Sequence, residues 1–189
     1  MERKVFEADT LGEYNMASAT ELYNFLQTGK IINIGMHPEH NEIQKQLSNL
    51  YPSPFKLDGV EYASVEAFWM SIKYPENSQR REEVRKLSGV AAKLAGKGME
   101  NIATIQYLWK DIQVGSEEHH ALLKRAIRAK LENNPKILKT LLDTWDTKLV
   151  HIVFTRHIDK KYILHDSKTI PWEKFAQIYM ELRDELRDK

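Results

Sequence analysis

The stretch Leu47–Glu66 constrains the fold more than any other part of this chain of 189 residues. Pro52 and Pro54 rule out a helix at its start, and the later Asp58-Gly59 pair, which lies between two short triplets with β-branched and aromatic residues, favours a tight hairpin turn. Ser64 then offers an N-cap, so a helix begins directly after the hairpin and carries a glutamate in its first turn. The stretch therefore predicts a loop, a small β-hairpin and a helix in immediate succession.

Hydrophobic spacing and capping signals predict mainly helical structure for the rest of the chain. The predicted helices cover residues 17–28, 64–74, 79–87, 89–95 and 116–133, and two more begin at Pro135 and Pro171. Clusters of β-branched and aromatic residues predict strands at 31–32, 148–154 and 161–165, of which the last two could pair. The expected fold class is α+β, a mainly helical single domain with a small β-hairpin and a short sheet. Residues 1–30 are expected to be an N-terminal extension with a short helix, and residues 31–189 the domain itself.

The composition excludes several classes of protein. With 42% hydrophobic and 29% charged residues, the chain is expected to fold rather than to stay disordered. It has no apolar run long enough to cross a bilayer, its first residues lack the apolar stretch of a signal peptide, and it contains no cysteine. We therefore expect a cytoplasmic protein without membrane contact, disulfides or thiolate chemistry.

Two pairs of histidines invite comparison with zinc sites, in which histidine is a common ligand. They are His37 with His40, and His119 with His120. Pro38 breaks the helical spacing of the first pair, and the sequence places no third ligand beside either pair. Surface positions explain these histidines better, so neither a metal ion nor another cofactor is expected.

The order of motifs from Leu47 onward resembles that of one known family. The block Leu47–Glu66 resembles the opening motif of the NADAR (YbiA-like) N-glycosidase family, in which a proline-containing segment and a hairpin lead into a helix with the key glutamate. Lys73 near the end of that helix, the stretch Arg80–Gly98 and the basic run Lys124–Lys130 follow in the same order as in the family. The resemblance covers roughly residues 31–186 and implies the fold of that family.

The resemblance also implies an enzyme that hydrolyses the bond between a ribose C1 and a nitrogen. Substrates of the family are phosphoribosyl intermediates of riboflavin synthesis or ADP-ribose attached to guanine bases. The expected partner is therefore a small ribosyl phosphate or ADP-ribosyl compound, either free or carried on a guanine of a nucleic acid. The oligomeric state is not predicted.

Matched by position, the catalytic residues of the family correspond to Glu66, Trp109 and Asp159. Cleavage of a ribose C–N bond passes through an oxocarbenium-like transition state, which needs negative charge near C1 and a base that orients water. Glu66 suits either task, Asp159 could hold the ribose hydroxyls or share the proton transfer, and Trp109 could stack on the leaving base.

Six further residues are predicted to bind the substrate. Two lie in the proline loop, two follow the glutamate on its helix, and two project from adjacent positions of a later basic helix, where they could clamp a phosphate. They are Asn49, Tyr51, Trp69, Lys73, Arg125 and Arg128. A solvated basic face is the simpler explanation of the two arginines.

Simpler explanations stay open for the catalytic residues as well. Glu66 could merely complement the helix dipole, Trp109 could be a core or interface aromatic, and Asp159 could be a turn residue between strands. The family's usual histidine after the glutamate is Ala67 here, and its glycine-rich loop is replaced by residues 160–164, which lack glycine. A non-catalytic module that binds ADP-ribose or another nucleotide is therefore the alternative function. The net charge of +1 disfavours a third hypothesis, nucleic-acid binding through the basic helices.

Overall fold

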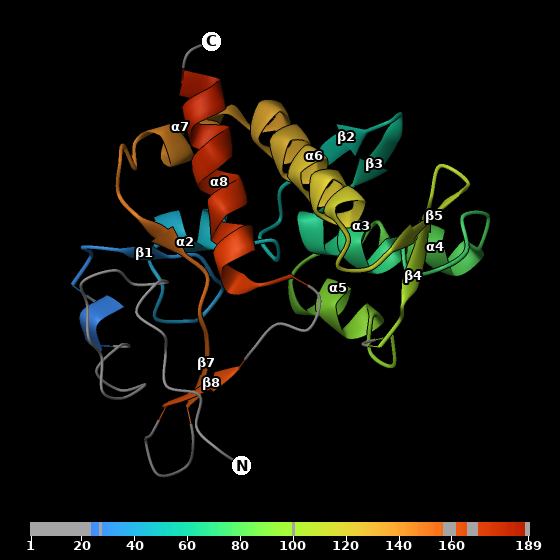
Figure 1. Ribbon diagram of the computed structural model, residues 1–189, viewed down its shortest axis with the longest axis horizontal. Helices are drawn as coiled ribbons and strands as arrows, with labels where there is room; N and C mark the ends of the chain where they lie inside the picture. Colours follow the sequence, from blue (N-terminus) through green and yellow to red (C-terminus); the bar gives the residue numbers. More distant parts are fainter. Residues whose placement is uncertain (1–23, 27, 100, 157–161, 166–169, 188–189) are drawn as a thin grey trace.

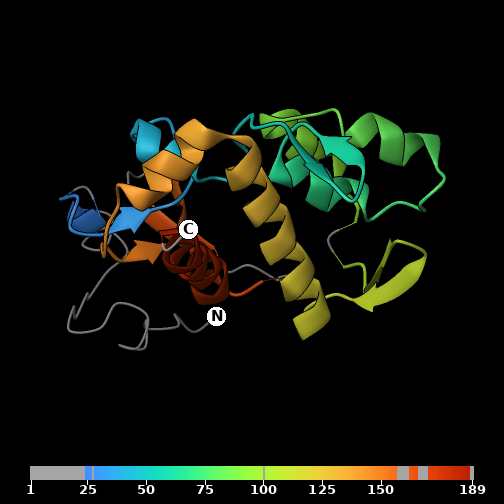
Figure 2. The ribbon, with the colours of Figure 1, turned by 90° about the horizontal axis from the view of Figure 1, so that it is seen from above.

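Helix α6 (Glu117–Asn133) lies between two groups of elements in both views of the computed structural model (Figure 1; Figure 2). The structure describes residues 24–26, 28–99, 101–156, 162–165 and 170–187. One group contains α2 (Glu42–Gln46), α7 (Pro135–Leu142), α8 (Trp172–Arg187) and the strands β1 (Ile32–Asn33) and β6 (Leu149–Val150). The other contains α3 (Val65–Ser71), α4 (Gln79–Val84), α5 (Gly89–Ala95) and the strands β2 (Phe55–Leu57), β3 (Val60–Tyr62), β4 (Thr104–Tyr107) and β5 (Lys110–Gln113). The predicted α+β class is confirmed.

The predicted loop, hairpin and helix succeed one another as expected. Strands β2 and β3 pair antiparallel, with Asp58 (φ 47°) and Gly59 (φ 84°) in the left-handed conformation that a type I′ turn requires. Ser64 then caps α3, because its Oγ accepts the N–H of Ala67 at 3.0 Å. Every residue of α3 except Glu66 is buried, so this helix is enclosed by its neighbours.

The strand predicted over residues 148–154 is wrong as a single element. Its first part, β6, pairs in parallel with β1, whereas its second part, β7 (Val153–Arg156), pairs antiparallel with β8 (Tyr162–His165). The side chain of Asn33 explains the break, since it binds both the C=O and the N–H of Ile152 at 3.0 and 2.8 Å. The predicted pairing of the two segments holds for β7 and β8. Of the helix predicted at 17–28, residues 24–26 are helical, and most of the remainder lies outside the described residues.

One helix and one β-hairpin were not predicted from the sequence. Helix α2 begins with a capping box, in which Asn41 and Gln44 satisfy each other's backbone N–H groups. Strands β4 and β5 form a hairpin whose turn residues Leu108 and Trp109 have φ angles of 50° and 63°. Glycine, asparagine and aspartate usually occupy such a turn, so the sequence carries no signal for it.

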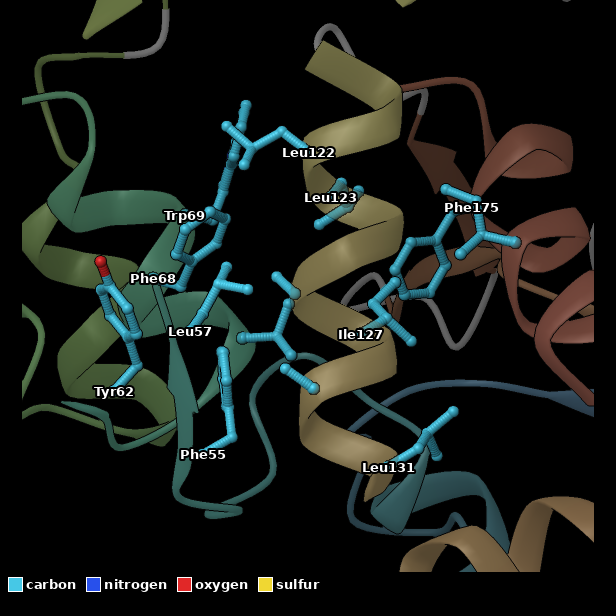
Figure 3. Close-up of a cluster of buried hydrophobic side chains, with 14 of the residues drawn as sticks. Phe55, Leu57, Tyr62, Phe68, Trp69, Leu122, Leu123, Ile127, Leu131 and Phe175 are labelled. Carbon is cyan, nitrogen blue, oxygen red and sulfur yellow. The ribbon is translucent and has the colours of Figure 1, made fainter. Parts of the chain in front are cut away.

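The hydrophobic core surrounds α6 on both sides. Figure 3 shows Leu123 and Ile127 of α6 between aromatic residues of the β2–α3 region and Phe175 of α8. Rings of Tyr62 and Phe68 meet edge to face at 5.1 Å between centroids. The helical spacing predicted for the last helix is confirmed, because its apolar residues Phe175, Ile178, Tyr179, Leu182 and Leu186 are all buried. Within the described part of the chain, no helix is both long and apolar enough to span a membrane.

Candidate functional site

The backbone of Glu66 is fixed by the loop that precedes the hairpin. Its N–H donates to the C=O of Asn49 at 2.9 Å, and the N–H of Gly89, the first residue of α5, donates to the C=O of Leu50 at 3.0 Å. The starts of α3 and α5 are therefore held by adjacent carbonyl groups of one loop. These contacts satisfy N–H groups that a helix leaves free at its N-terminus.

Lys130 of α6 binds the start of the same loop. Its side chain is fully buried, and its Nζ donates to the C=O of Gln46 at 2.7 Å and to the C=O of Ser48 at 2.9 Å. Burial lowers the pKa of this ammonium to about 7. The loop is thus the point where α3, α5 and α6 meet. The sequence signalled Lys130 only as a member of a basic run.

The carboxyl group of Glu66 is partly buried, and burial raises its pKa. The positive charges of Lys93 and Lys73 act in the opposite direction. Asn49, whose backbone C=O accepts the N–H of Glu66, has a buried Oδ1 without a hydrogen-bond partner among the described residues. The site therefore combines a carboxylic acid with a raised pKa, two nearby cations and an available amide oxygen.

Trp69 follows Glu66 by three residues on α3 and so lies on the same face of the helix, whereas Lys73 lies two residues after the end of α3. Trp69 is 8% exposed, and its ring centroid lies 4.3 Å from that of His119, while Lys73 Nζ lies 5.7 Å from the Trp69 ring centroid. Trp69 thus contacts both His119 and Lys73. Its predicted binding of a substrate stays a prediction.

Lys93 of α5 interacts electrostatically with Glu66 and with a histidine that follows β6. Its charge acts on the Glu66 carboxyl group and also on the ring of His151, which follows β6. Nδ1 of His151 lies 2.8 Å from the C=O of Ile34, and burial lowers the pKa of this ring. Neither Lys93 nor His151 was singled out in the sequence, because only the fold brings residues so distant in the chain together.

Two predicted site residues make contacts elsewhere. The hydroxyl of Tyr51 donates to Glu42 of α2 at 2.8 Å. Trp109 lies at the turn of the β4–β5 hairpin, which both ribbon views place at the outer end of the molecule, away from α8 (Figure 1; Figure 2). The Trp109 residue is 72% exposed, and its backbone N–H donates to Glu76 at 2.5 Å. The structure therefore shows no contact between Trp109 and Glu66 that would support the predicted role of Trp109.

The two predicted phosphate-binding arginines are paired with carboxylates. Arg125 binds both oxygens of Asp58 at 2.7 Å, and the hydroxyl of Tyr107 donates to the same aspartate. Arg128 forms an ion pair with Glu185 of α8. A phosphate at either arginine would have to displace an existing carboxylate. The third catalytic candidate, Asp159, lies outside the described residues.

The expectation that the paired histidines lie at the surface is wrong for His119 and His40. His119 is fully buried and His40 is 9% exposed. In the described ranges of the chain, no three histidine, aspartate or glutamate side chains are grouped as metal ligands would be.

Two surface cavities lie on the β2–β3 side of the molecule, and Glu66 lines neither of them. One, of about 290 Å³, is lined by Lys56, Glu61 and Arg85 among others. The other, of about 80 Å³, includes Arg81 and Tyr107. Their charged residues already pair with one another, as Arg85 does with Glu82, so the chemistry around Glu66 makes it the better candidate site.

Comparison with known proteins supports the family that the motifs indicate. Residues 42–180, well over half of the chain, match the family described as Bacteriophage protein GP30.3. A search of curated proteins finds no match. Among solved structures, the NMR structure of the E. coli protein YbiA is similar, with a TM-score of 0.55 and 21% sequence identity over 84% of this chain and 86% of that one. The chain therefore has the YbiA fold and belongs to the Bacteriophage protein GP30.3 family, which confirms the NADAR (YbiA-like) resemblance of its sequence.

Proposed function

We propose that the protein is an N-glycosidase that hydrolyses the ribose C1–N bond of a ribosyl phosphate or an ADP-ribosyl compound, with Glu66 as the catalytic carboxylate. The observation that carries the proposal is the partly buried Glu66 carboxyl group, whose pKa burial raises, beside Lys73 and Lys93. A group that exchanges protons in catalysis works best when its pKa lies near the working pH. Two neighbouring cations suit an anionic substrate.

The proposed reaction needs one proton acceptor and a stabilised positive charge on the ribose. Glu66 as carboxylate takes a proton from water while the water oxygen bonds to C1 and the C1–N bond breaks, its electron pair going to the nitrogen. The negative charge of Glu66 stabilises the oxocarbenium character of C1. The proton then passes to the leaving base, so that the products are a free base and a reducing ribose phosphate.

The substrate class follows the family resemblance. Phosphoribosyl intermediates of riboflavin synthesis and ADP-ribosylated guanine are the proposed candidates, and Asp159 and Trp109 keep their proposed supporting roles. Incubation of the protein with these compounds, with NAD and with ADP-ribose, followed by mass spectrometry, would identify the released base.

The decisive variant is Glu66→Gln, which keeps the size of the side chain and its backbone hydrogen bond but removes the proton acceptor. We expect normal folding and a loss of turnover of about 100-fold or more. Glu117→Gln is the matched control, because Glu117 also lies in the first turn of a helix but is 90% exposed in its side chain. A Glu66→Gln protein as active as wild type would refute the assignment.

A non-catalytic ADP-ribose-binding module is the second candidate. Two observations favour it: the sequence 160–164 lacks glycine, and Ala67 has only a methyl group, which cannot donate or accept a proton as the family's histidine can. Calorimetry with ADP-ribose separates the candidates. Tight binding without release of any base from the substrate panel supports the module.

A further inference from the structure

Three imidazole nitrogens near the start of α6 are buried without a hydrogen-bond partner among the described residues. They are Nε2 of His119 and both ring nitrogens of His120, for which the described residues supply no hydrogen bond. Buried polar atoms are nearly always hydrogen-bonded, so three such atoms in adjacent rings require an explanation. The two ring centroids are 5.6 Å apart.

The hydrogen bonding of His119 fixes which of its nitrogens carries the proton. The N–H of Gly115 donates to Nδ1 at 3.2 Å, so Nδ1 is an acceptor. Burial, with added effects from His120 and Lys73, lowers the pKa of the ring to about 4, and the ring is neutral at physiological pH. Nε2 must then carry the proton and is a buried donor.

The surroundings of this donor favour an anion. His119 and His120 lie in the first turns of α6, a helix of 17 residues, whose N-terminal end is positive. Lys73 is close enough for its charge to affect His119. The acidic residues of this turn, Glu117 and Glu118, are exposed.

We propose that Lys73, His119 and His120 form the subsite for a phosphate group of the substrate, just beyond the C-terminal end of α3, the helix that carries Glu66. This inference rests on the proposed function, in which the ribose next to Glu66 is phosphorylated. It places the phosphate away from Arg125 and Arg128, whose guanidinium groups already bind carboxylates. His119 Nε2 donates to a phosphate oxygen, and Lys73 supplies the charge.

The test compares binding of ribose 5-phosphate, inorganic phosphate and ribose by calorimetry. Wild type is expected to bind ribose 5-phosphate more tightly than ribose. The substitution His119→Phe keeps a ring beside Trp69 but removes the donor, and should weaken binding of ribose 5-phosphate by about tenfold or more. His119→Gln, whose amide nitrogen can donate, should recover part of the loss, and Arg125→Gln and Arg128→Gln should bind as wild type does.

Equal binding of ribose 5-phosphate by wild type and His119→Phe would overturn the inference, as would equal binding of ribose and ribose 5-phosphate by wild type. If His119→Phe does not fold, His120→Phe takes its place, since that ring is only partly buried. Measuring the same affinities in Glu66→Gln separates the two proposals. Phosphate binding that depends on His119 without any hydrolysis would contradict the proposed function alone.

Discussion

Lys130 is a buried cation whose hydrogen-bond partners are two backbone carbonyl groups and, at 3.4 Å, the hydroxyl of Tyr179. The sequence places it in a basic run on a helix, where exposure is the usual expectation. Its partners Gln46 and Ser48 lie more than 80 residues away, so no local pattern could reveal its burial. Glu66 was predictable because it belongs to a motif of neighbouring residues, whereas Lys130 depends on the assembled fold.

Burial of Lys130 makes its contribution to stability depend on pH. Its pKa is about 7 when folded and 10.5 in the unfolded reference, so between these values the unfolded state binds more protons. The free energy of unfolding should therefore rise with pH in this window, by up to about 1.4 kcal/mol per unit from this group. Urea denaturation at several pH values should show that slope in wild type relative to Lys130→Met. Parallel profiles of the two proteins would contradict it.

Some helices and strands could be predicted from local sequence signals such as turn and cap residues. Others depend on contacts between residues far apart in the chain. The β2–β3 hairpin was predictable from Asp58-Gly59, and α3 from its cap Ser64. The parallel pair of β1 and β6 joins residues more than 100 positions apart, and its strands are only two residues long, so no local pattern could predict their pairing. The β4–β5 hairpin was missed because its turn contains two residues that rarely adopt positive φ.

That turn offers a test of what Trp109 does. Leu108 and Trp109 are 52% and 72% exposed, so their side chains bury little surface. Asn-Gly at these two positions should relieve the strain of the positive φ angles and raise the free energy of unfolding by about 1 kcal/mol. Thermal denaturation measures this change. If turnover falls while the melting temperature rises, Trp109 takes part in the reaction; the single variant Leu108→Asn is the control. A lower melting temperature would show that the two side chains stabilise the hairpin.

At the scale of the molecule, α8 closes the core on one side of α6. Its burial pattern was predictable from its spacing, but its contacts with α6, α7 and β6 were not. Ile178→Ala should lower the free energy of unfolding by about 2–5 kcal/mol, because Ile178 is 2% exposed and its loss leaves a cavity. Asp184→Ala, on the exposed face, should change it by less than about 0.5 kcal/mol. Similar effects of the two changes in chemical denaturation would contradict this account of the core.

The loop before the hairpin joins three helices through main-chain carbonyl groups. The C=O groups of Asn49 and Leu50 accept the N–H groups of Glu66 in α3 and Gly89 in α5, and the C=O groups of Ser48 and of Gln46, the last residue of α2, accept from Lys130. Every amino acid supplies a carbonyl, so these hydrogen bonds do not depend on which side chain stands at Asn49 or Leu50. We therefore expect the backbone contact of Glu66 to persist when Asn49 is replaced, so that a substitution there can change contacts with a ligand while the carboxylate stays in place.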